Sequence, residues 1–410
     1  MKLLIIHNFY THLTGEDLLV KDISQLLKNS GMIKVAEYYK YSQDFHNSSW
    51  IKKIIALFQG NIPFYVSGEL RATLDREKPD IALIHNLVPL INPWAVKELR
   101  KRDIPIIFYN HNFRIICPRG TCVLKDKFCI RCFNVSLFCG IMHNCLGNFL
   151  YSLLYAYRVF WQRLFLNYID SFVLSNESWR KLLREMLHKN NIAFINAYVS
   201  IPADLKNSGW QKKDYVIFAG RLVKEKGVDI LLQCAALLPE IQFKICGDGP
   251  LMGHCCDYIK KRKLRNIELL GLIERKKLLR IIRDAQVLIC PSFYYEFGFT
   301  AREAMLLGTP VIALKNDVTA EWITHNKTGF LFAAENIESL VQAIRRLRED
   351  ETLRRSIALQ AYELVKEQSN PERYILDFLN ICNNVLSKRP IPNNVHSVFS
   401  CGVGKYKTLS

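Results

Sequence analysis

Apolar runs of strand length alternate with segments whose apolar positions recur at helical spacing, most clearly in the second half of the chain. The strands predicted there cover residues 215–220, 243–250, 267–271, 287–292 and 309–314. The helices predicted between them cover residues 228–238, 256–263, 275–285 and 300–308. Short apolar strands that alternate with helices predict a parallel sheet covered on both faces, and such sheets bind ligands at the carboxyl ends of their strands.

The first half shows the same alternation less regularly. Its predicted strands cover residues 2–10, 79–86, 105–112 and 170–176, and its predicted helices cover residues 18–28, 93–101 and 149–168. A cysteine-rich insertion, residues 117–145, follows the third strand. The alternation predicts an α/β fold with an N-terminal Rossmann-like domain, residues 1–205, and a C-terminal one, residues 206–370, with a linker near residues 201–213. A helix within residues 371–388 is expected to pack back on the N-terminal domain, and residues 389–410 form a tail.

Composition agrees with a folded chain of two domains. The 410 residues are 50% hydrophobic and 23% charged, which excludes a disordered chain. The formal net charge of +18 favours acidic partners, which are nucleic acid, anionic lipid head groups or phosphorylated substrates. No basic run with interleaved aromatic residues of the recognised kinds occurs, so a nucleic-acid partner is not expected.

The chain is expected to be cytoplasmic. The apolar run that opens the sequence is interrupted by His7 and Asn8, so it is too short for the core of a signal peptide and fits a buried strand. Thirteen cysteines cannot all pair, which fits a reducing compartment. Residues 132–157 contain no charged side chain apart from histidine but are interrupted by Asn, Ser, His and Gly, so a membrane-spanning helix is not expected there.

Three segments of the second half, AGRLVKEKG (219–227), ICGDGP (245–250) and PSFYYEFGFTAREAMLLGTPVIA (291–313), closely resemble in order and spacing the family-4 retaining glycosyltransferases of the GT-B fold. In the first half, HNFYTHLTGEDLLV (7–20), PDIALIHNL (79–87) and YNHNFRIICPRG (109–120) resemble the bacterial branch that builds surface polysaccharides. The resemblance implies two Rossmann-like domains whose parallel sheets face each other across a cleft. The acceptor would bind mainly to the first domain and the nucleotide sugar mainly to the second.

The resemblance also implies a donor site. Arg221 and Lys226 match the two bases that contact the diphosphate, which GT-B enzymes neutralise without a bound metal; the alternative is that both are solvated loop charges. Glu303 matches the carboxylate that accepts hydrogen bonds from the donor ribose. Gly15 would let the first loop approach the diphosphate, although the family's Gly-Gly is here Thr14-Gly15. The remaining predicted donor-binding residues are Gly220, Gly247, Gly298, Phe299 and Thr300.

Two further residues are expected to be catalytic beside Arg221 and Lys226. His111 matches the family's cleft histidine, and Glu296 the glutamate near the transferred sugar. The family places its two glutamates eight positions apart, whereas Glu296 and Glu303 are seven apart, so either the loop is one residue shorter or Tyr295 takes the first position. Candidates of second rank at strand ends or for acceptor contacts are His7, Asn8, Glu16, His85 and Arg114.

The cysteine-rich insertion suggests a structural metal. Cys129 and Cys132 have the spacing of a zinc knuckle, and Cys117 and Cys145 could complete four thiolates; the alternative is a set of reduced buried thiols. Such a zinc would be structural, and no cofactor is expected to be required for catalysis.

The combined reading is a retaining hexosyltransferase that moves a hexose from a UDP- or GDP-sugar to a saccharide acceptor. The resemblance implies a lipid-linked acceptor and a role in cell-surface polysaccharide biosynthesis. The aromatic residues and two arginines of residues 149–168 either form core or contact the inner face of the cytoplasmic membrane. The alternatives are an epimerase or hydrolase of nucleotide sugars on the same fold, or a non-catalytic subunit that binds nucleotide sugars.

Overall fold

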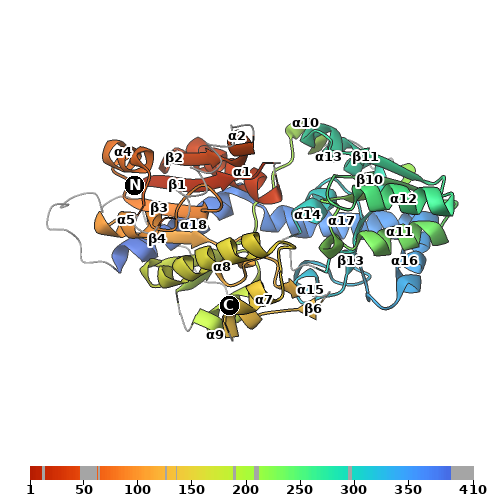
Figure 1. Cartoon of the computed structure of the whole chain (residues 1–410). Coiled ribbons are helices and arrows are strands. Elements are labelled where there is room, and N and C mark those ends of the chain that lie inside the picture. Colours follow the sequence, from red (N-terminus) through yellow and green to blue (C-terminus); the bar gives the residue numbers. More distant parts are fainter. Residues whose placement is uncertain are drawn as a thin grey trace.

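Two six-stranded parallel sheets with helices on their faces make up the chain (Figure 1). The computed structural model describes residues 1–11, 14–46, 62, 65–124, 127–134, 136–187, 191–206, 212–293 and 298–388. The strand orders are β2-β1-β3-β4-β7-β8 and β11-β10-β9-β12-β13-β14. The predicted fold class, an α/β chain with two parallel sheets, is confirmed.

The first sheet is built around strands that are almost wholly apolar and buried on both faces, as parallel strands require. Its strands are β1 (Lys2–Phe9), β2 (Lys34–Tyr41), β3 (Ile81–Asn86), β4 (Ile106–Tyr109), β7 (Ser171–Leu174) and β8 (Ile192–Phe194). Its covering helices are α1 (Gly15–Ser30), α2 (Ser42–His46), α4 (Gly68–Glu77), α5 (Ala95–Lys101), α9 (Glu177–Leu187) and α18 (Pro371–Ser387). The edge strand β2 was not predicted, because its charged and tyrosine side chains are half-exposed and give no apolar run.

The second sheet follows the predicted alternation closely. Its strands are β9 (Lys213–Ala219), β10 (Gln242–Cys246), β11 (Ile267–Gly271), β12 (Ala285–Cys290), β13 (Val311–Leu314) and β14 (Phe330–Phe332). The helical segments are α10 (Ala203–Lys206), η3 (Lys224–Lys226), α11 (Val228–Leu237), α12 (Met252–Arg262), α13 (Arg275–Asp284), α14 (Phe299–Leu306), α15 (Thr319–Trp322), α16 (Ile337–Glu349) and α17 (Glu351–Gln368).

The last described helix, α18, lies against the first sheet although it follows the second domain in sequence (Figure 1). Tyr374 and Phe378 of this helix are buried in one apolar cluster with Leu3 and Ile5 of β1. Burial of this face of α18 stabilises its packing on the first sheet, since buried apolar area contributes roughly 25 cal/mol per Å².

The insertion between β4 and β7 packs on the first sheet, since Phe113 and Phe165 lie in one apolar cluster with Ile84 of β3. It contains η1 (Phe113–Ile115), the antiparallel pair β5 (Val123–Leu124) and β6 (Lys127–Phe128), α6 (Arg131–Asn134), α7 (Phe138–Met142), α8 (Phe149–Leu164) and η2 (Leu166–Tyr168). Within the described parts of the chain, no helix is both long and apolar enough to cross a membrane.

Candidate active site

The carboxyl ends of the two sheets meet where the start of α1 touches the start of α14. A Cβ atom added to Gly15 would lie only 3.2 Å from Cδ2 of Phe299, and Phe299 itself packs against both apolar clusters of the first domain. Gly15 is therefore placed by a close approach between domains and not by a left-handed backbone. Arg119 of the insertion forms an ion pair with Glu225, which makes a second bridge between the domains.

The loop that follows β9 carries both predicted diphosphate bases. A Cβ atom on Gly247, whose φ is 139°, would lie 1.9 Å from the carbonyl oxygen of Gly220, so only glycine fits and the loops after β9 and β10 lie in contact. The side chain of Lys226 reaches back towards Gly220, since its Cδ lies 3.9 Å from the position of a Cβ there. Arg221 is exposed at the same end of the sheet.

The helix α14 brings the other predicted donor residues to this edge. Gly298 has a φ of 65° and caps the helix, and Phe299 and Thr300 form its first turn, where backbone N–H groups attract anions. Glu303 is 9% exposed, and its carboxylate pairs with Arg275 at 3.0 Å. Burial raises the pKa of Glu303 to about 7, and Arg275 opposes that rise. Glu296 and Tyr295 lie outside the described residues.

Replacing Glu303 by glutamine is expected to stabilise the protein at about pH 8 and to leave its stability unchanged at about pH 4. The folded-state pKa of this carboxyl lies above its ordinary value of 4.5, so its stabilising contribution is present below that value and is lost as the pH rises to about 7. The gain at alkaline pH should be roughly 1–3 kcal/mol, since each pKa unit corresponds to about 1.4 kcal/mol. Urea unfolding at both pH values measures it.

Glu363→Gln serves as the matched control, because the Glu363 side chain is 59% exposed on α17. It should leave stability unchanged at both pH values. If Glu303→Gln destabilised the protein at alkaline pH, the carboxylate would be stabilising as an ion and the buried donor-site assignment would lose its electrostatic basis.

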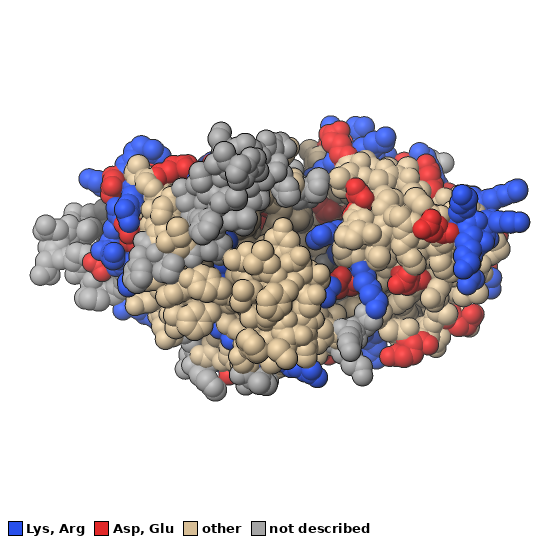
Figure 2. Space-filling view, in the orientation of Figure 1, with Lys and Arg blue, Asp and Glu red and all other residues tan. Residues whose placement is uncertain are grey.

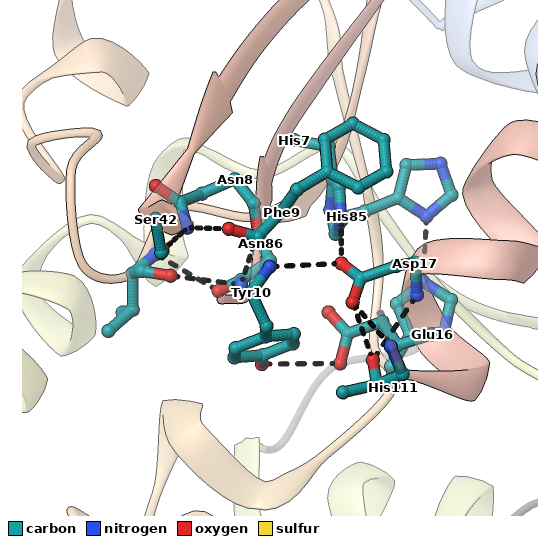
Figure 3. Close-up of polar contacts among 12 residues, drawn as sticks. His7, Asn8, Phe9, Tyr10, Glu16, Asp17, Ser42, His85, Asn86 and His111 are labelled. Atoms are coloured by element: carbon teal, nitrogen blue, oxygen red, sulfur yellow. Dashed lines mark hydrogen bonds and ion pairs between the residues drawn. The ribbon is translucent and has the colours of Figure 1, made fainter. Parts of the chain in front are cut away.

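Three buried histidines end neighbouring strands of the first sheet (Figure 3). His85 Nδ1 and His111 Nε2 lie 2.7 Å apart, so that one nitrogen donates a hydrogen bond to the other, and their rings are stacked at 5.0 Å. The ring of His7 meets His85 edge to face at 6.0 Å. Burial lowers the pKa of His111 and of His85 well below 6.5, so both imidazoles are neutral near pH 7. The structure thus brings together His111 and two of the candidates of second rank.

The remaining neighbours of the histidines have structural partners. His7 Nε2 lies 2.9 Å from Asp17 Oδ1, and Asp17 Oδ2 accepts the backbone N–H of Thr14 at 2.7 Å (Figure 3). This carboxylate locks the start of α1 to β1 and so positions Gly15. Sequence reasoning missed Asp17, although Thr14 and Asp17 have the spacing of a capping box. The buried amide of Asn8 is engaged by Ser42 and the N–H of Leu90, which gives it a structural role.

Glu16 and Arg114, which the sequence did not distinguish from surface charges, are both half-buried and close enough to interact electrostatically. Glu16 Oε2 accepts from Asn112 Nδ2 at 3.1 Å and from the Tyr10 hydroxyl at 3.4 Å, while its buried Oε1 has no hydrogen-bond partner. Burial raises the pKa of Glu16 to about 7 despite Arg114, whose guanidinium stacks 5.1 Å from the Tyr10 ring. This unpaired oxygen, one residue from Gly15, is a group suited to a ligand hydroxyl.

The cysteines of the insertion gather in one region but not as a metal site. The twelve cysteines among the described residues are all free thiols. A hydrogen bond from Cys122 lowers the pKa of Cys117 to about 6. In the portion of the chain that is described, no three His, Cys, Asp or Glu side chains are grouped to hold a metal ion, so the four predicted ligands do not form a site as placed. Structural zinc on Cys117, Cys129, Cys132 and Cys145 stays a prediction.

Comparison with known proteins relates part of this chain to glycosyltransferases. Residues 200–364 match the family described as glycosyl transferases group 1. The chain is 28% identical over 174 residues to the 2-deoxystreptamine N-acetyl-D-glucosaminyltransferase of Niallia circulans, a match that covers 41% of this chain and 45% of the relative. The chain spans less than half the length of the curated relatives it matches.

Solved structures resemble the whole chain. Sucrose-phosphate synthase from Thermosynechococcus elongatus superimposes with a TM-score of 0.68 at 16% identity and covers 95% of this chain and 100% of its own. HepE of Anabaena, solved in complex with UDP, gives a TM-score of 0.62 at 16% identity and covers 94% of this chain and 100% of its own. At these identities the likeness concerns the fold, and the predicted GT-B fold is confirmed.

Proposed function

We propose that the protein is a retaining glycosyltransferase, because residues 200–364 match the family described as glycosyl transferases group 1 and the chain has the GT-B fold. It moves a hexose from a nucleotide-diphosphate sugar to a saccharide acceptor. UDP is the favoured nucleotide, since the similar HepE was solved with UDP, and GDP is the second choice.

The observation that carries this proposal is the contact of Gly15 with Phe299, which joins the carboxyl ends of both sheets. Glu303 lies on the same helix as Phe299, and Lys226 lies over Gly220 at the carboxyl end of β9 in the same sheet. Parallel α/β sheets bind ligands at this edge. The edge presents two cations, the amino end of α14 and a buried carboxylate. This set of groups suits a nucleoside diphosphate, whose phosphates need positive charge and whose ribose hydroxyls need an acceptor.

In the proposed reaction, Arg221 and Lys226 neutralise the charge that develops on the leaving diphosphate, and no catalytic metal is required. The N–H groups at Phe299 and Thr300 support them, and Glu303 accepts the ribose hydroxyls in place of its contact with Arg275. The neutral His111 donates a hydrogen bond to a hydroxyl of the transferred sugar. The acceptor attacks from the face that the diphosphate leaves, and a phosphate oxygen takes the acceptor proton, so the configuration is retained.

The proposed acceptor is a lipid-linked saccharide in cell-surface polysaccharide biosynthesis, bound at the inner face of the cytoplasmic membrane. Support comes from the first domain, where the free Oε1 of Glu16 and the guanidinium of Arg114 lie beside the histidines. These groups can accept from and donate to the hydroxyls of a saccharide.

A thermal-shift screen with UDP, GDP and their sugar conjugates is expected to raise the melting temperature with a single nucleotide diphosphate. A ligand that binds only the folded state stabilises it by about 2.7 kcal/mol at 100 times its Kd. Arg221→Ala should abolish the shift and leave the unliganded melting temperature unchanged, because Arg221 is exposed. A shift of equal size in the variant would contradict the diphosphate role of Arg221.

A further inference from the structure

The helix α8 exposes large apolar side chains and buries polar ones, which is the opposite of the usual arrangement. Its large apolar side chains Phe149, Leu153, Phe160 and Leu164 lie four or seven positions apart, which places them on one side of the helix, and are 43 to 65% exposed. Its buried side instead contains polar residues, including Arg158 and Gln162. A helix of a water-soluble domain normally turns its apolar stripe to the core. The stripe therefore does not serve the packing of the first domain.

The neighbouring helix α7 extends this surface. Phe138 and Met142 are 60% and 69% exposed, and α7 packs against α8. Figure 2 shows a broad area over these two helices without any Lys, Arg, Asp or Glu side chain. We call this surface, made of the exposed side chains of α7 and α8, the α7–α8 face. Contiguous apolar areas of this kind mark interaction sites.

The charges near the α7–α8 face favour an anionic surface as its partner. Residues 127–169 contain no Asp or Glu, and the cation Arg131 lies exposed on α6, next to α7. The whole chain has a formal net charge of +18, so two copies repel each other and an anionic surface attracts each of them. An apolar helical face with bordering cations is the pattern of helices that lie in a membrane interface.

We propose that the α7–α8 face docks into the interfacial layer of an anionic lipid bilayer. The side chains of Phe149, Leu153 and Phe160 enter the boundary between head groups and acyl chains, while the polypeptide stays on one side of the membrane. Arg131 at the border of the face contacts the anionic head groups. No other macromolecule is needed to cover the apolar area.

The opposite side of α8 connects this docking face to the acceptor side of the active site. Arg158 donates to the carbonyl oxygens of Pro89 and Ile91, the latter at 2.9 Å. Tyr155 of α8 is close enough to Tyr10 to interact with it electrostatically. Arg158 is close enough to Arg114 to do the same. Docking thus brings the Glu16–Arg114 region near the membrane surface, where the head group of a lipid-linked saccharide lies. This last step rests on the proposed function, whereas the docking does not.

Flotation of the full chain with vesicles tests the docking. One set contains phosphatidylcholine and phosphatidylglycerol, and the other phosphatidylcholine alone. The face variant combines Phe149→Glu, Leu153→Glu and Phe160→Glu. The matched control combines Leu237→Glu, Leu359→Glu and Leu376→Glu, since these leucines are 49 to 55% exposed on other helices and the change in charge is the same. We expect the wild-type chain and the control to float with the anionic vesicles, and the bound fraction of the face variant to fall at least about tenfold.

Equal binding by the face variant, or absence of wild-type binding to anionic vesicles, would overturn the proposal. The proposal would also be overturned if the wild-type chain did not bind vesicles but formed a dimer that the face variant could not form. A second copy of the chain would then cover the face. The thermal shift with UDP is measured on the same variants and should be unchanged, which shows that they fold. Vesicle binding without any nucleotide shift would refute the proposed transferase and leave the docking standing.

Discussion

Replacing Lys226 by alanine is expected to lower kcat/KM for sugar transfer by roughly 100- to 1,000-fold while the protein remains folded. Lys226 ends the short η3 segment, and its side chain points back over Gly220 at the carboxyl end of β9. An ammonium group there would act on charge that grows as the diphosphate leaves, so its loss should affect kcat more than the binding of the intact donor. Steady-state kinetics with a nucleotide sugar and a saccharide acceptor separate the two constants.

Lys224→Ala is the control for Lys226→Ala, because it removes the same charge from the same short segment at a position exposed to solvent. It should change kcat/KM by less than about threefold, as expected for an exposed charge screened by salt. Equal losses in the two variants would mean that the loop contributes only a general positive potential. An active Lys226→Ala variant would remove the basis for the proposed diphosphate site.

The grouping of the predicted donor residues at one edge of the second sheet could be inferred from the sequence, because these residues lie directly after strands that the sequence displays. The apolar runs that become β9, β10 and β12 end in glycine or proline, and the loops that follow carry Arg221, Lys226 and Gly247. Parallel strands place those loops at one edge of the sheet, so sequence order and strand direction suffice to group them. The sequence did not predict why position 15 is glycine, since the reason is the close approach of Phe299 from the other domain.

The acceptor side depends on contacts that sequence spacing does not encode. Glu16 and Arg114 are almost a hundred residues apart, and only the pairing of β1, β3 and β4 brings their loops together. The aromatic stripe of α8 has the same periodicity whether it faces inward or outward. Its outward direction follows from the burial of Arg158 on the other side of the helix. There the guanidinium donates hydrogen bonds to the carbonyl groups of Pro89 and Ile91.

Replacing His111 by alanine is expected to lower kcat by roughly 100-fold, the lower end of the range for loss of one positioned hydrogen-bond donor in an active site. The neutral imidazole is held between the ring of Tyr109 at 4.5 Å and His85, whose Nδ1 is 2.7 Å from His111 Nε2. Alanine removes both the donor and the partner of His85. His111→Gln retains an amide donor of similar reach and should recover activity to within about tenfold of the wild-type value.

The pH dependence distinguishes a neutral hydrogen-bond donor from an acid–base catalyst. Because burial holds the pKa of His111 and His85 well below 6.5, neither should contribute a limb to the profile of kcat between about pH 6 and pH 8. Glu16 and Glu303, each with a pKa of about 7, do titrate in that range, so a limb near neutrality should be altered in Glu16→Gln or Glu303→Gln and persist in His111→Gln. If the limb instead vanished only in His111→Gln, the imidazole would change its charge during turnover. Its role would then be proton transfer, and the histidine stack would have to open towards water when substrate binds.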